Sequence, residues 1–226
     1  MRDLFSTTRS VSPEDDGGAK KRSDDPNNQL SVKTSKVRTH HIARRVSSEL
    51  VLNESLPWHF EVGMSYHCFS FGDVDSLSYL RAIVKQQRVE YVMLSTWCMA
   101  HTDAKEIADW IERGDLGRID FYVGEIFQAN YMSVYLKLKE LVESFAGRVC
   151  IFRNHSKVMV GFGERFDFTI ESSANVNTNP RSEQTVITID SALARFYKEE
   201  IFDQINSFNH DFDHWQPYKL KRDEIV

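Results

Sequence analysis

The order of strand-like and helix-like segments is the feature that most constrains the fold of this chain. Strands are predicted at 65–71, 89–97 and 119–127, because these runs are short, apolar and rich in β-branched or aromatic residues. Each is followed by a segment with apolar residues at helical spacing, at 75–86, 103–114 and from 131 to Gly147. This alternation is typical of a parallel sheet covered by helices.

The alternation then stops. Three strand-like runs, "RVCIF", "SKVMVGF" and "FDFTIES", follow one another with no room for helices, and "GFGERFD" supplies a hairpin turn. A further strand, "EQTVITID", precedes a last helix from Ser191 to Phe208, which Asp190 or Ser191 can cap and whose apolar face is Leu193, Tyr197, Ile201, Ile205 and Phe208. The sequence therefore predicts an α/β domain with a mixed β-sheet flanked by helices on both faces.

This domain is expected to span 56–215, between two polar segments. Residues 1–55 form an N-terminal extension, disordered over its first 30 residues, with a possible helix at 39–52. Residues 216–226 read as a charged C-terminal tail. The extension carries ten Lys/Arg and eight Asp/Glu (+2), and the remainder 18 and 25 (−7), which together give the net charge of −5.

Charge and composition exclude several classes of protein. An acidic globular part argues against a broad nucleic-acid-binding surface, although Ser31–Arg45 has five Lys/Arg, two histidines and no acid. That basic segment is either a phosphate-contacting arm or a solvated linker. The three cysteines lack metal or disulfide spacing, and neither a leader peptide nor a long apolar segment is evident. A cytoplasmic protein without stable membrane insertion is expected.

Polar residues gather at the predicted ends of neighbouring strands. His155 and Lys157 stand at the head of the run "SKVMVGF", where positions i and i+2 of a strand point to one face. After the hairpin, "ESSANVNTNPRSEQ" places Ser173, Asn175 and Glu183 in a loop between two strands. We expect an imidazole, an ammonium, a hydroxyl, a carboxamide and a carboxylate to converge there.

With these residues in place, the chain resembles the phospholipase D superfamily, whose signature is H-x-K, then G-S-x-N about twenty residues later, then an acidic residue. His155 and Lys157, Ser173 and Asn175, and Glu183 match it. Two positions depart from the motif. Phe162 stands where the family has an aspartate, and Ser172 replaces the glycine. The resemblance covers about 160 residues and implies the family's half-module fold.

The chemistry assigns a role to each matched residue. Lys157 and Asn175, with Ser173 as a further donor, suit the non-bridging oxygens of a phosphodiester. A neutral His155 can attack phosphorus, and Glu183 can orient its ring. The resemblance implies a reaction without metal or other cofactor. It also implies two copies of the motif, and because only one H-x-K occurs, we expect a homodimer whose second His155 is the general acid.

The sequence thus predicts a metal-independent endonuclease that forms a phosphohistidine, acting on nucleic acid, DNA rather than RNA. A phospholipid-hydrolysing enzyme and an inactive phosphate-binding module stay as alternatives. His101, after the second strand, is a candidate substrate contact, and Asn130 is a weaker one. "HDFDHW" at 210–215 has the spacing of a metal site, but a solvated helix end explains it better.

Overall fold

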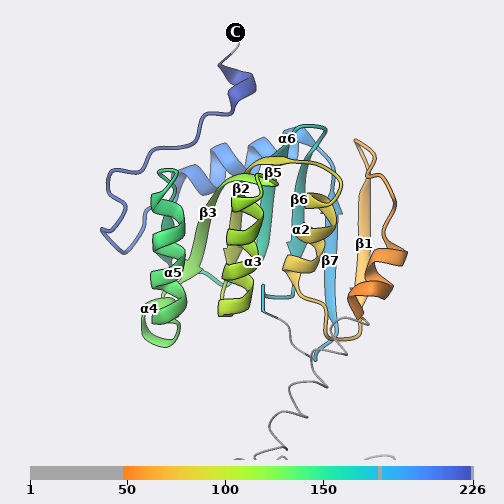
Figure 1. Ribbon diagram of the computed structural model, residues 1–226, viewed down its shortest axis with the longest axis horizontal. Helices are drawn as coiled ribbons and strands as arrows, with labels where there is room; N and C mark the ends of the chain where they lie inside the picture. The colour runs from red at the N-terminus through yellow and green to blue at the C-terminus, as the bar shows by residue number, and fades with distance from the viewer. Residues whose placement is uncertain (1–47, 178–179, 225–226) are drawn as a thin grey trace, which may run out of the picture. The chain divides into compact units, whose positions relative to one another are not determined.

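The computed structural model describes residues 48–177 and 180–224. The predicted disorder of residues 1–30, and the part of the predicted helix before residue 48, lie outside these ranges; residues 48–55 are helical. Within the described ranges, seven strands form one sheet in the order β1-β7-β6-β5-β2-β3-β4 (Figure 1). Their bounds are β1 Ser65–Ser70, β2 Val89–Thr96, β3 Leu116–Gly124, β4 Val149–Phe152, β5 Val158–Gly163, β6 Asp167–Ser172 and β7 Glu183–Thr188.

The directions of the strands follow the two rhythms of the sequence. β2, β3 and β4, which helices connect, are parallel. β5 pairs antiparallel with β2, and β6, β7 and β1 continue the antiparallel pairing. The predicted hairpin joins β5 to β6, with Phe162 opposite Asp167. The mixed sheet expected from the sequence is therefore confirmed.

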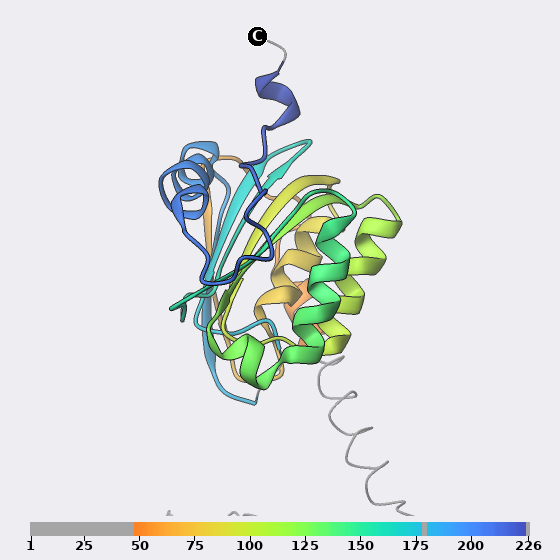
Figure 2. The same cartoon turned by 90° about the vertical axis from the view of Figure 1, so that its left-hand side faces the viewer.

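Helices cover both faces of the sheet (Figure 2). One face carries α2 Ser76–Val84, α3 His101–Glu112, α4 Ile126–Asn130 and α5 Met132–Glu143. The other carries α6 Ser191–Arg195 and the turns that follow it. Alternation along β2 divides the core accordingly, since Val92 and Leu94 pack on the first side and Tyr91 and Met93 on the second.

Two sequence predictions are wrong in detail. The third strand ends at Gly124 instead of Phe127, because the chain turns there into the short helix α4. The last helix does not run regularly to Phe208. After Arg195 it continues as a π-helical turn, Phe196–Ile201, and a 3₁₀ turn, Phe202–Gln204.

The irregular turns also change which residues of this element are buried. The buried side chains are Ala194, Lys198 and Phe202, while Ile201 and Phe208, expected in the apolar face, are 39% and 60% exposed. Asp190 caps the helix as predicted, accepting a hydrogen bond from the Leu193 N–H at 2.7 Å.

Charged side chains are buried beneath this second helical layer. Lys198 Nζ lies 2.6 Å from Asp203 Oδ2, and both side chains are less than a tenth exposed. Asp120, fully buried, accepts hydrogen bonds from the Tyr91 hydroxyl at 2.8 Å, the Arg148 backbone N–H at 2.9 Å and the Trp215 indole at 3.0 Å. The bond from Trp215 attaches the C-terminal segment to the sheet.

Candidate functional site

The topology brings several loops to one edge of the sheet. Since β5 is antiparallel to β2, and β6 to β5, the end of β2, the start of β5 and the end of β6 meet. The backbone continues this pairing beyond the strands, as the Ser172 N–H donates to the Lys157 carbonyl at 2.9 Å and the Ser173 N–H to the Gln184 carbonyl at 2.9 Å. The segments that carry the predicted site residues therefore lie side by side.

His155 and Lys157 are in contact, although not as two residues of a strand. Both belong to the loop before β5, which begins at Val158. Lys157 is only 8% exposed, whereas His155 is exposed to solvent. The ammonium donates to the His155 carbonyl at 2.6 Å and lies 3.2 Å from Nδ1 and 3.5 Å from Nε2 of the ring. Because an ammonium has no lone pair, the ring nitrogen that it contacts must accept.

The surroundings of Lys157 disfavour its charge. Burial lowers the pKa of the ammonium, and the nearby groups Cys98 and Glu183 oppose this shift in part. Burial also raises the pKa of the Cys98 thiol, which donates to Asn177 Oδ1 at 2.7 Å. The charge of a bound anion would offset the cost of burying the Lys157 ammonium, so this position favours an anionic ligand.

The remaining three motif residues lie in the neighbouring loop and strand. The Ser173 hydroxyl donates to Glu183 Oε2 and accepts the Gln184 N–H at 3.0 Å. Asn175 Oδ1 accepts the backbone N–H of Trp97 at 3.3 Å, which links this loop to the end of β2. The electrostatic effect of Glu183 on Lys157 connects the two halves of the constellation.

A buried asparagine that the sequence prediction missed holds the histidine loop in place. Asn154 is 5% exposed, and its Nδ2 donates to Ser95 Oγ at 2.9 Å and to the Tyr122 carbonyl at 2.9 Å. Its Oδ1 accepts the Ser156 N–H at 2.9 Å and the Ser156 hydroxyl at 2.7 Å. One feature of the sequence could have pointed to this role, since Asn154 directly precedes the H-x-K segment.

An aromatic residue adjoins the histidine. The Trp97 and His155 rings are tilted by 58° with their centroids 5.1 Å apart, and Trp97 is 36% exposed. Gly124 makes this packing possible, since a Cβ at that position would lie 2.7 Å from the Trp97 ring and 3.0 Å from the Asn154 carbonyl oxygen. The contact of Trp97 with His155 and the need for glycine at 124 could not be read from the sequence, because both depend on where β2 and β3 end.

Other candidates lie elsewhere or have other roles. His101 begins α3, is exposed, and has its Nε2 2.8 Å from the hydroxyl of Ser133 on α5. Phe162 stands where the resembled family has an aspartate. It is 1% exposed and stacks on Tyr91 on the α6 side of the sheet. His210 contacts Asp213 at 3.3 Å. Across the described ranges, no group of three or more His, Cys, Asp or Glu side chains could hold a metal ion.

Comparisons with known proteins find similarity at the level of structure alone. No family model matches the sequence, and no curated protein matches it. TrmBL2, an archaeal chromatin protein with a novel mode of DNA binding, aligns with a TM-score of 0.47 and 10% identity over 75% of this chain. Phosphatidylserine synthase of Haemophilus influenzae Rd KW20 aligns with a TM-score of 0.49 and 16% identity over 67% of this chain.

This chain spans less than two thirds of either structure, 63% of the first and 41% of the second. At such scores neither alignment bears on the chemistry of the site. In the part of the chain that the structure describes, no helix is long and apolar enough to cross a bilayer.

Proposed function

We propose that this chain is a phospholipase D-like phosphodiesterase that cleaves nucleic acid, DNA rather than RNA, without a metal ion. One observation carries the proposal. An exposed imidazole contacts a buried ammonium at 3.2 Å, at the edge of the sheet where Asn175 and the Ser173–Glu183 pair also lie. The ammonium and the amide would neutralise the charge of a phosphodiester, and the imidazole would react with its phosphorus.

The proposed reaction proceeds in two steps. An unprotonated ring nitrogen of His155 forms a bond to phosphorus, and the bond from phosphorus to the leaving oxygen breaks while a general acid gives that oxygen a proton. Water then loses a proton to the same acid, now a base, and attacks phosphorus as the P–N bond breaks. Lys157 and Asn175 contact the non-bridging oxygens in both steps, with Ser173 as a further donor.

The general acid is proposed to be His155 of a second copy of the chain. A homodimer with a two-fold axis through the site would place two such histidines on opposite sides of one phosphate. Light scattering, and the recovery of activity when two differently inactivated copies are mixed, test this arrangement.

Nucleic acid is the favoured substrate because of the sequence before the described residues. The segment Ser31–Arg45 has five Lys/Arg, two histidines and no acid, a composition suited to phosphate contacts. The role of this segment is part of the proposal.

A phospholipid substrate is the second candidate, and two exposed aromatics favour it. Phe69 and Phe71 are 62% and 86% exposed with ring centroids 5.3 Å apart. They lie at the end of β1, where Ser70 pairs with Glu183. An aromatic pair beside the site could enter a membrane surface. Binding to phospholipid vesicles, lost in Phe71→Ser, together with phospholipid cleavage would select this candidate.

The deciding experiment is a cleavage assay in the presence of a chelator, with single-stranded DNA, duplex DNA, RNA and phospholipid as substrates. We expect DNA cleavage that EDTA does not inhibit and that His155→Ala abolishes. His210→Ala, which removes an exposed histidine of the C-terminal segment, is the matched control and should keep full activity. Cleavage that EDTA stops, or that survives in His155→Ala, would refute the proposal. DNA binding by both proteins without cleavage by either would select a phosphate-binding module.

A further inference from the structure

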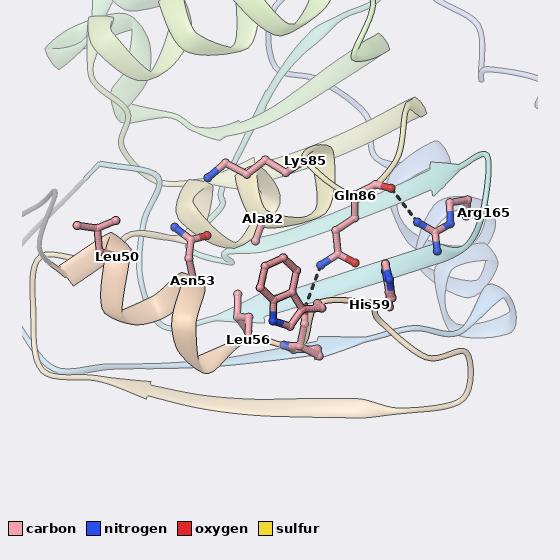
Figure 3. Close-up of a pocket in the computed structure, with 10 residues that line it drawn as sticks. Leu50, Asn53, Leu56, His59, Ala82, Lys85, Gln86 and Arg165 are labelled. Carbon is pink, nitrogen blue, oxygen red and sulfur yellow. Dashed lines mark hydrogen bonds between the residues drawn. The ribbon is translucent and has the colours of Figure 1, made fainter.

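A hollow lies at the end of the sheet away from the His155 loop. It has a volume of about 610 Å³ and lies between the helix at 48–55, the end of α2 and the β5–β6 turn (Figure 3). β5 runs from the His155 loop at Val158 to Gly163, so Arg165 in the following turn is at the end away from that loop. The hollow is therefore separate from the phosphodiester site.

The lining combines an exposed indole with basic side chains. Trp58 is 91% exposed, a very high value for a tryptophan. Lys85, Arg165 and His59 also line the hollow, and none of its described lining residues is acidic. Figure 3 shows Lys85 near Asn53 on one side, and Arg165 near His59 on the other.

One wall of the hollow is fixed by hydrogen bonds. Gln86 donates from Nε2 to the Pro57 carbonyl at 3.1 Å and accepts the Phe60 N–H at 3.2 Å. Arg165 Nη1 donates to the Gln86 carbonyl at 3.0 Å. These bonds hold the chain on both sides of Trp58 and keep the Arg165 guanidinium at the Gln86 carbonyl. The backbone of this wall is thus fixed before any ligand binds.

We propose that this hollow binds one nucleotide unit, a base stacked on Trp58 with its phosphate held by Lys85. Indole and guanidinium planes are suited to stacking on bases of any sequence, and cations without an acid among them attract phosphate. The volume is in the range of small-ligand sites. The ligand is either a free nucleotide or a nucleotide of a single strand.

Charge along the sequence favours a strand. The basic segment Ser31–Arg45 ends only a few residues before the helix at 48–55 that lines the hollow. A segment of this composition suits the phosphates of a nucleic-acid strand. This inference does not depend on the proposed phosphodiesterase, since the hollow would bind a nucleotide whether or not the His155 site cleaves one.

The test measures binding with the full chain in the His155→Ala background, so that cleavage cannot interfere. Fluorescence anisotropy of a short labelled oligothymidylate gives the affinity for a strand, and competition by thymidine monophosphate gives that for a free nucleotide. We expect Trp58→Ala and Lys85→Ala each to weaken binding about tenfold. Trp58→Phe, which keeps an aromatic face, should weaken it less.

Lys105→Ala is the control for loss of charge, because Lys105 is a 72% exposed lysine on α3. A Trp58-dependent affinity for the oligonucleotide alone assigns the hollow to a strand, and one for the mononucleotide as well assigns it to a free nucleotide. Unchanged binding of both in Trp58→Ala would overturn the inference, as would an equal loss in Lys105→Ala. Trp58-dependent binding to anionic phospholipid vesicles with no effect on either nucleotide would also overturn it.

Discussion

Among the residues that the structure describes, two lysines are buried, and their partners differ. Lys198 contacts a carboxylate, Asp203, at 2.6 Å on the α6 side of the sheet. Lys157, at the sheet edge, contacts the carbonyl and the imidazole of His155, neither of which carries a full negative charge, and the nearby Glu183 offsets its burial only in part. The first lysine is neutralised within the fold, whereas the second keeps a charge that a ligand can satisfy. The partner, more than the burial, thus distinguishes a structural lysine from a binding one.

The largest expected effect on stability comes from breaking the structural pair. Lys198→Met leaves the Asp203 carboxylate buried without its cation, and should lower the free energy of unfolding by about 3–5 kcal/mol in urea denaturation. The double variant Lys198→Met/Asp203→Leu should recover most of that loss. A loss below about 1 kcal/mol in the single variant would contradict a structural role for the Lys198–Asp203 pair.

A smaller loss is expected where the histidine loop is attached to the sheet. Asn154→Ala removes the hydrogen bonds to Ser95, Ser156 and the Tyr122 carbonyl, and should cost about 2–3 kcal/mol together with most of the activity. Asn154→Asp keeps the acceptor for Ser156 but places a buried carboxylate oxygen against the Tyr122 carbonyl, so it should cost at least as much in urea denaturation. Full activity in Asn154→Ala would mean that this anchoring does not position His155.

Removing the binding lysine should stabilise the fold slightly. Lys157→Met deletes a cation that burial disfavours, so we expect the free energy of unfolding at pH 7 to rise by about 1 kcal/mol. Chelator-resistant cleavage should be lost in the same variant. A marked loss of stability would place Lys157 among the structural residues, beside Lys198.

The smallest expected effect is a pH dependence of the stability that Lys157→Met gains over the wild type. Because the pKa of Lys157 is lowered in the folded state, the unfolded chain binds more protons between this lowered pKa and the ordinary value of 10.5. Wild-type stability attributable to this group therefore rises with pH across that window, and the advantage of Lys157→Met should shrink towards pH 10.5. If the stability difference between Lys157→Met and the wild type stayed constant from pH 7 to pH 10, burial of the ammonium would not be the cause of the gain.

The sequence was sufficient for the fold because each strand and helix has a strong local pattern. It was less informative where tertiary contacts override that pattern, as in the π-helical turn that buries Lys198 in place of Ile201. His155 and Lys157 are in contact, but in a loop and not on one face of a strand as their spacing predicted, and the contributions of Asn154 and Trp97 required the positions of strand ends that are distant in sequence. Their polar and aromatic contacts cross from one loop to another, and no local pattern encodes them.

The pairing of the first strand with the last has a consequence for how the protein is made. β1 hydrogen-bonds to β7, with Ser65 opposite Thr188. During synthesis β1 must therefore wait, with its polar backbone unpaired, until more than half of the chain has followed it out of the ribosome. Glu183 opens that same last strand, so a nascent chain cannot assemble the complete site before its sheet is closed.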